Sequence, residues 1–177
     1  MPRPKKRRAA ETRRGAFEGE LQHHGTFGFV LSALPGGKDV FVRGPSLRLA
    51  MPGDRVEARV LGERGGRLEG EIVRVLRRAR ETIVGVLRRE AGNWRLAPED
   101  AKLGQPIEVL GFSRGLFPAE GVLAEARITR WPTAHQAAGG LVSEVLGTPG
   151  APGVRIEGLM RARGVPSNFS EEVLREL

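Results

Sequence analysis

The chain has 177 residues, of which 40% are hydrophobic and 28% charged, a composition typical of a globular protein with room for one ordinary domain or two small ones. It contains no cysteine, so disulfides and thiolate metal sites are excluded and a reducing compartment is expected. There is no run of 18 apolar residues and no apolar segment behind the basic N-terminus. We therefore expect neither a membrane span nor a secretory signal, and a cytoplasmic location.

Positive charge is concentrated towards the N-terminus. The formal net charge is +8. Residues 1–14 carry seven Lys and Arg against one acidic residue, residues 15–90 carry thirteen against ten, and residues 91–177 carry nine against ten. This distribution favours a nucleic-acid partner for the first half of the chain. We expect residues 1–14 to be a disordered basic arm.

Residues 15–78 contain short β-type segments separated by Gly- and Pro-rich turns. "PGGKD" and "ERGG" are typical hairpin turns, and Val56, Ala58 and Val60 alternate with charged residues as in a half-buried strand. Five short strands over this length predict a small barrel of the oligonucleotide-binding (OB) type. The predicted strands are residues 16–21, 26–31, 39–43, 55–61 and 67–76.

A second β-rich unit follows over residues 79–148. A hairpin across "RREAG" and two later runs predict strands at residues 82–87, 93–96, 121–129 and 141–146. The fold class is therefore all-β, with two consecutive small five-stranded barrels. Residues 149–177 are predicted to form a linker and a short C-terminal helix, which either Asn168 or Ser170 can cap.

The stretch "GTFGFVLSALPGGKDVFVR", residues 25–43, places three phenylalanines close together in a chain with only 5% aromatic residues. In a strand, Phe27 and Phe29 point to the same face, and Gly28 leaves the opposite face without a side chain. Phe41 follows after the Gly-rich turn. The pattern leaves two interpretations open, a core face or a stacking platform for bases.

Several segments, in order, resemble one known family. "GTFGFVLS" and "DVFVRGPSL" resemble the RNA-binding motifs of cold-shock domains. "GDRVEARVLGERGGRLEGEIVRVLRRARETIVGVLRREAGNWRLAPED" resembles the junction between the two cold-shock domains of bacterial ribonuclease R, in the ribonuclease II superfamily. "ITRWPTAHQAAGGLVSEVLG", followed by "GVRIEGLMRARGVPSNFSEEVL", resembles the passage towards its nuclease domain.

The resemblance implies a first cold-shock OB domain at 15–78 and a second at 79–148, with 149–177 leading towards a nuclease domain that is absent. In the family that domain degrades RNA from the 3′ end, and clustered aspartates hold its Mg²⁺. Asp39, Asp54 and Asp100 lie far apart in turn-like segments and offer no such cluster. We therefore expect no catalytic residue, no metal and no cofactor in this chain, which is predicted to be inactive alone.

The resemblance also assigns candidate RNA-binding residues. By match to the cold-shock motifs, Phe27, Phe29 and Phe41 form the stacking platform, and Arg43 lies on the face of Phe41, where a guanidinium can stack or bind phosphate. Gly44 stands where free cold-shock proteins often carry another aromatic residue, which implies weaker binding. Further candidates are Lys38, Arg55, His24, Arg77 and Arg78.

Three other features have competing interpretations. Trp94 and Trp131 could stack on bases, but a tryptophan on a short strand is more typical of core packing. The basic run at residues 74–81 is either a solvated connector or part of a phosphate track. The chain's three histidines, with no cysteine, do not predict a zinc site.

The leading hypothesis is a single-stranded RNA-binding tandem cold-shock module of a ribonuclease R-like 3′–5′ exoribonuclease, which captures RNA for its catalytic domain. Single-stranded RNA is the expected partner, the ribosome is a further candidate, and the chain is expected to be a monomer. Two alternatives remain open: a free-standing RNA-binding or RNA-chaperone protein, and a protein-interaction scaffold. Exposure of Phe27, Phe29 and Phe41 beside Arg43 would weaken the scaffold alternative.

Overall fold

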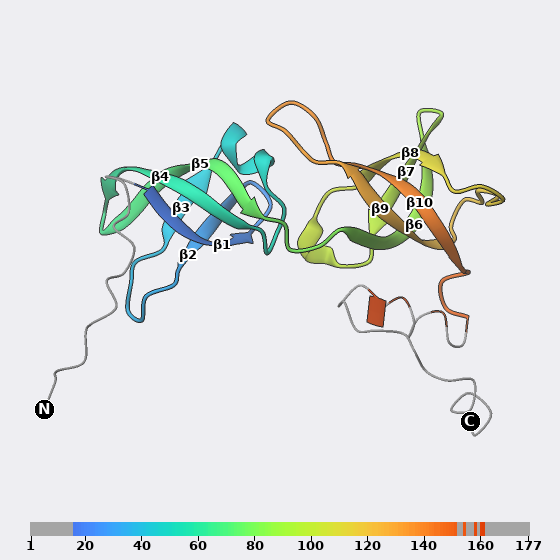
Figure 1. Cartoon of the computed structure of the whole chain (residues 1–177), viewed down its shortest axis with the longest axis horizontal. Coiled ribbons are helices and arrows are strands. Elements are labelled where there is room, and N and C mark those ends of the chain that lie inside the picture. The colour runs from blue at the N-terminus through green and yellow to red at the C-terminus, as the bar shows by residue number, and fades with distance from the viewer. Residues whose placement is uncertain (1–15, 152–153, 155–157, 159, 162–177) are drawn as a thin grey trace, which may run out of the picture.

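The computed structural model describes residues 16–151, 154, 158 and 160–161, and within them shows two closed five-stranded β-barrels in succession along the chain (Figure 1). The predicted all-β class with two five-stranded barrels is confirmed. The basic arm at 1–14 and the helix near Asn168 lie outside the described residues. No helix in the described part has the length and apolar content needed to cross a membrane.

The first barrel closes through the strand order β1-β2-β3-β5-β4, with β4 paired back to β1. Its only parallel pair joins β3 to β5, and its other pairs are antiparallel. All five predicted strands are confirmed, with some differences at their ends. The elements are β1 (Ala16–His23), β2 (Phe27–Ser32), β3 (Val40–Arg43), the 3₁₀ turn η1 (Pro45–Leu49), β4 (Arg55–Arg64) and β5 (Arg67–Arg77).

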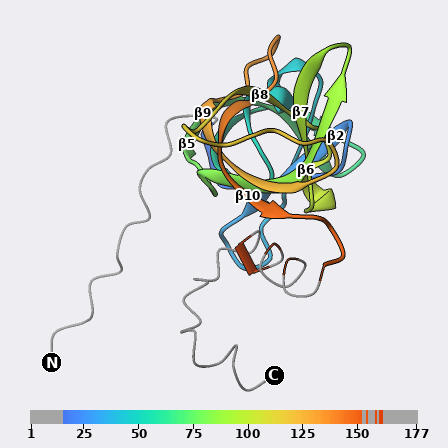
Figure 2. The same cartoon turned by 90° about the vertical axis from the view of Figure 1, so that its right-hand side faces the viewer.

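The second barrel repeats this topology in the order β6-β7-β8-β10-β9, and Figure 2 shows its strands as a ring. The elements are β6 (Thr82–Glu90), β7 (Asn93–Pro98), η2 (Ala101–Leu103), β8 (Ile107–Phe112), β9 (Leu123–Arg130) and β10 (Gly139–Gly147). The sequence patterns did not predict β8. This strand has only two register pairs with its neighbour β7, and its parallel pairing with β10 joins residues about thirty positions apart.

Each barrel has its own hydrophobic core, and Met51 of the first barrel packs against the core of the second. Val56 and Ala58 are fully buried in the first core, as their alternation predicts. Met51, in the connection between η1 and β4 of the first barrel, packs instead into the core of the second. The two barrels therefore share an apolar contact.

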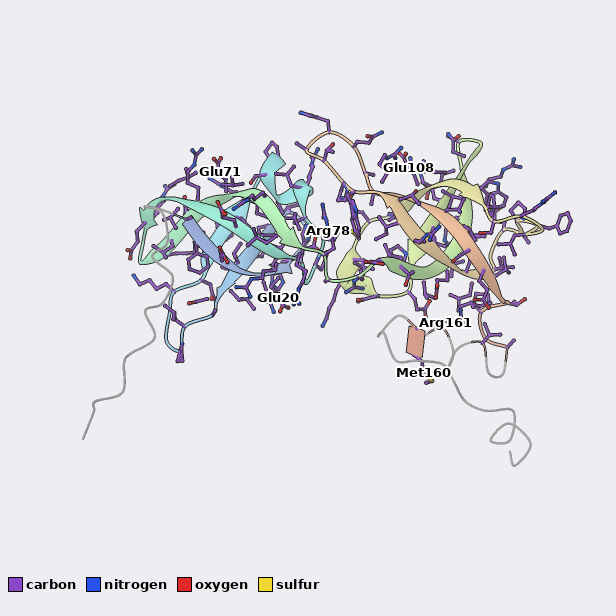
Figure 3. All side chains as sticks on the ribbon, viewed as in Figure 1. Glu20, Glu71, Arg78, Glu108, Met160 and Arg161 are labelled. Atoms are coloured by element: carbon purple, nitrogen blue, oxygen red, sulfur yellow. The ribbon has the colours of Figure 1, made fainter. Side chains whose placement is uncertain are left out.

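A buried carboxylate organises the junction between the barrels. Asp54 is 1% exposed. Its Oδ2 accepts hydrogen bonds from the backbone N–H of Met51 and from Arg78, both at 2.8 Å, and its Oδ1 accepts from the N–H of Ala79 at 2.9 Å. The Arg78 guanidinium carbon lies 4.4 Å from the ring centre of Trp131 in the second barrel. Figure 3 shows Arg78 in the space between the barrels.

Replacing Asp54 by Ala should lower the free energy of unfolding by about 3–5 kcal/mol, because a partly buried guanidinium and two N–H groups lose their acceptor. Urea unfolding followed by far-UV circular dichroism measures this loss. The matched control is Glu63→Ala, which breaks an exposed ion pair with Lys38 and should cost less than about 1 kcal/mol. Equal stability of the two variants would contradict the structural role of Asp54.

Candidate nucleic-acid interface

The three phenylalanines of the Gly-rich stretch lie on the outer surface of the first barrel. On β2, Gly28 and Val30 point inward, so Phe27 and Phe29 point outward. A Cβ at Gly28 would lie 2.8 Å from the carbonyl oxygen of Gln22, so only glycine fits at that position.

The same alternation holds on β3. Val40 and Val42 are fully buried on either side of Phe41, which therefore points outward. All three phenylalanines are half-buried, and none belongs to the core of the first barrel. We call Phe27, Phe29 and Phe41 the aromatic platform.

The platform is a continuous aromatic surface across β2 and β3. Its three ring centres lie 5.6–5.9 Å apart, with tilted or edge-to-face packing. The exposed ring of His24, in the β1–β2 turn, extends it by stacking on Phe27 at 5.4 Å with an interplanar angle of 20°. Four rings in contact offer π-faces on which unpaired bases can stack.

Two arginines flank the platform. Arg43 is exposed and opposite Phe27 in the β2–β3 register, and it has no ion pair within the described part of the chain. Arg67, at the start of β5, places its guanidinium carbon 4.0 Å from the ring centre of Phe41. The sequence did not identify Arg67, because only the parallel pairing of β3 with β5 brings it to this face.

Of the other predicted cations, three are engaged elsewhere. Lys38 and Arg55 form exposed ion pairs with glutamates, at 2.5 Å and 3.5 Å respectively. Arg78 is held by Asp54 at the barrel junction. Arg77 is exposed at the far end of β5, opposite Arg55 in the register. The structure therefore brings His24 and Arg43, but not Arg78, to the aromatic platform.

A cleft of about 590 Å³ between the barrels begins at the end of the platform. His23, next to the platform ring of His24, lines it from the first barrel, as does the exposed Arg48; residues 132–138 line it from the second. Burial, and then the nearby His24 charge, lower the pKa of His23 from its ordinary value, so the ring favours its neutral form. In the described part of the chain no three His, Asp or Glu side chains gather closely enough to hold a metal ion.

The corresponding outer face of the second barrel has a different chemistry. Where the first barrel has aromatic rings on β2 and β3, the equivalent strands β7 and β8 carry Arg95 and Glu108. Glu108 accepts a hydrogen bond from Arg130 and forms an ion pair with Arg95 at 3.4 Å. The Arg130 hydrogen bond, supported by both guanidinium charges, lowers the pKa of the Glu108 carboxyl from its ordinary value of 4.5.

Both tryptophans are partly buried against the core of the second barrel. Trp94 lies against this core and forms a T-shaped pair with Phe112, with the ring centres 5.9 Å apart. Trp131 also contacts that core and lies beneath Arg78. Their packing agrees with the interpretation of these residues as core rather than as stacking sites.

The fold and this site define a tandem OB-barrel protein with an aromatic surface on its first barrel. Residues 19–75 match the ribonuclease B OB domain family, and residues 96–170 match the cold shock domain family. The chain is 37% identical to ribonuclease R of Acidithiobacillus ferrooxidans over 88% of its own length and 36% of that protein. It is 29% identical to ribonuclease R of Escherichia coli, of which it spans 19%. The chain therefore carries a ribonuclease B OB domain and a cold shock domain, and it corresponds in sequence to the tandem cold-shock region of ribonuclease R proteins, of which it spans about a third or less.

Solved structures share this architecture at low sequence identity. RNase R of Mycoplasma genitalium, in complex with ribose-methylated single-stranded RNA, superposes with a TM-score of 0.72 at 17% identity over 90% of this chain and 26% of that one. Yeast Ssd1, a pseudonuclease, superposes with a TM-score of 0.70 at 18% identity over 86% of this chain and 25% of that one. These likenesses concern the fold alone.

Glu108→Gln should lower the melting temperature at pH 7 by a few degrees, because the charged acceptor between two arginines is lost. The folded pKa of Glu108 lies below its ordinary 4.5, so its stabilisation is present above that pH and is lost as the pH falls through the folded pKa. Calorimetry from pH 7 downwards should show that the difference in melting temperature between wild type and variant shrinks as the pH falls below 4.5. Glu99→Gln, at a residue with no ion pair in the described part, is the control; a pH-independent Glu108→Gln difference would contradict the assignment.

Proposed function

We propose that this chain is the single-stranded RNA-binding module of a ribonuclease R-like 3′–5′ exoribonuclease, where it captures RNA for the catalytic domain. The observation that carries the proposal is the outward-facing aromatic platform with the exposed Arg43 beside it, which forms no ion pair among the described residues. The proposal includes a monomer in the cytoplasm that needs no metal or cofactor of its own. The relatives' larger size supports a role as one part of a longer enzyme.

Binding would use stacking for strand selection and cations for affinity. Unpaired bases can turn their faces onto Phe27, Phe29 and Phe41, whereas bases in a duplex remain stacked on one another. Arg43 can bind a phosphate at the edge of the platform, a contact that depends on salt but not on sequence. Stacking is tolerant of base identity, so the platform by itself selects single strands rather than sequences.

The second barrel would serve mainly to shape the path of the strand. Its outer face carries arginines neutralised by Glu108 rather than aromatic rings. Its loop 132–138, however, forms one wall of the cleft that begins beside His23 and His24. A strand that leaves the platform at His24 would enter this cleft.

Replacing Phe27 and Phe41 together by Ala should weaken binding of a single-stranded RNA 15-mer at least tenfold, since each stacked base contributes about 1–3 kcal/mol. Fluorescence anisotropy with a labelled oligonucleotide measures the loss, and a duplex of the same sequence gives the background. Phe117→Ala is the matched control, because Phe117 is 88% exposed in the β8–β9 loop of the second barrel. Equal binding of single strand and duplex, unchanged by the double substitution, would refute the proposal.

Arg43→Ala should weaken binding of single strands regardless of sequence and reduce the slope of log K against log salt by about one unit or less, as expected for one lost phosphate contact. Titrations at four salt concentrations give the slope. Arg114→Ala, which removes an exposed arginine from the second barrel, should leave the slope unchanged. An unchanged slope for Arg43→Ala would exclude this phosphate contact.

A further inference from the structure

A recess of about 400 Å³ adjoins the aromatic platform at Phe41. Phe41 and Arg43 line it from β3, Ser46 from η1, Leu61 from β4, and Glu69 and Glu71 from β5. We call it the Phe41 recess. It lies on the other side of Phe41 from β2, because β3 is hydrogen-bonded to β2 along one edge and to β5 along the other.

The β5 wall of the recess is acidic. Glu69 lies directly opposite Phe41 in the parallel register, and Glu71 follows on the same outer face, while Gly70 between them faces the buried Val40. Figure 3 shows Glu71 on the outside of the first barrel. These carboxylates lie beside a platform that is proposed to bind RNA, which is a polyanion.

Glu69 and Glu71 each pair with one arginine, and both carboxylates keep acceptor positions that these ion pairs do not use. Glu69 forms one ion pair with Arg67 at 3.3 Å, and Glu71 forms one with Arg59. An ionised carboxylate has about four acceptor positions, so each glutamate can accept further hydrogen bonds. The paired arginines offset the charge of the wall, while its carboxylates still accept N–H donors.

A second polar group, the hydroxyl of Ser46, lies at the recess. The hydroxyl oxygen of Ser46 is buried and makes no hydrogen bond within the described part of the chain. Together, Ser46 and the two glutamates make this a polar site with an aromatic wall and an aliphatic wall, Phe41 and Leu61.

We propose that the Phe41 recess is a base-recognition subsite that prefers an amino-bearing base, such as cytosine, over uracil. The proposal rests on the proposed function, since it supposes a single strand on the platform. Cytosine presents an N4 amino donor where uracil presents the O4 acceptor, and carboxylates are the side chains that accept from this amino group. Uracil O4 would face the carboxylates of Glu69 and Glu71 without a proton between them.

The positions of Arg43 and Arg67 agree with a bound base whose edge points towards β5. Arg43 on the β3 side of the recess can hold a phosphate, and the carboxylates on the β5 side accept N–H donors, so the base edge turns towards β5 and the backbone towards Arg43. Arg67, over the ring of Phe41, can continue the stack as a planar guanidinium. The platform then selects single strands, while this one subsite adds a base preference.

The first test compares binding of single-stranded C₁₅ and U₁₅ RNA at pH 7.5 by fluorescence anisotropy. Wild type should bind C₁₅ about fivefold or more tightly, in the range of one good base contact. Glu69→Gln/Glu71→Gln should bring the ratio close to one, because an amide can donate to uracil O4. The control Glu18→Gln/Glu57→Gln removes the same charge from carboxylates outside the recess and should keep the wild-type ratio.

A second variant guards against misfolding of the double glutamine variant. Leu61 is 63% exposed, so Leu61→Arg should be tolerated and should place a guanidinium against the two carboxylates. It should likewise abolish the preference for C₁₅. Far-UV circular dichroism verifies the fold of each variant.

The outcomes separate this inference from the function on which it rests. Equal binding of C₁₅ and U₁₅ that still depends on Phe27 and Phe41 would overturn the recess proposal and leave the RNA-binding function intact. A C₁₅ preference that survives both recess variants would also overturn it. No preference for either single strand over duplex would overturn both proposals together.

Discussion

The arrangement of this molecule depends on one buried carboxylate. Burying a charge is costly unless good hydrogen bonds compensate it, and Asp54 meets this condition with donors from two separate segments, residue 51 before β4 and residues 78–79 after β5. The connection from β5 to β6 is thereby attached to the first barrel. Arg78, held by Asp54 on one side, presents its flat face to Trp131 on the other. The same carboxylate also holds the backbone N–H of Met51, a residue that lines the cleft beside the platform.

The two barrels show how one topology can carry two chemistries. Their strand orders are equivalent, and both bury aliphatic residues on the inner face. Their outer faces differ at the same strands: β2 and β3 carry aromatic rings, whereas β7 and β8 carry Arg95 and Glu108, which Arg130 at the end of β9 joins in an ion-pair network. The difference requires no change to the core, because alternate residues of a strand face opposite sides. Family membership therefore does not make the two barrels functionally interchangeable.

Local sequence patterns were sufficient to predict the strands of the first barrel and part of its candidate site. The alternation at Val56 and Ala58, the Gly-rich turns and the Phe-Gly-Phe spacing predicted its strands and the shared face of Phe27 and Phe29. The patterns left open whether that face was core or surface, since the answer depends on which residues lie beneath it. Gly28, packed against the carbonyl of Gln22, supplies the answer only once β1 is in place.

Other features arise from contacts between segments distant in sequence, and here local patterns were insufficient. Strand β8 and the position of Arg67 both depend on parallel pairings. A basic run such as residues 74–81 does not indicate which of its arginines has a buried partner. Arg78 was thus a candidate RNA contact from sequence, whereas in the structure its acid lies 24 residues earlier. The acidic wall of the Phe41 recess likewise exists only after β5 has paired with β3.

The placement of the tryptophans has a practical consequence for spectroscopy. The chain has two tryptophans and no tyrosine, and both tryptophans belong to the second barrel or its junction with the first. Near-ultraviolet fluorescence of the chain therefore comes from one barrel, while the platform lies on the other. A ligand that contacts only the phenylalanines of the platform therefore leaves the tryptophan fluorescence unchanged. A ligand that disturbs the junction changes it, because Trp131 lies against the charge of Arg78.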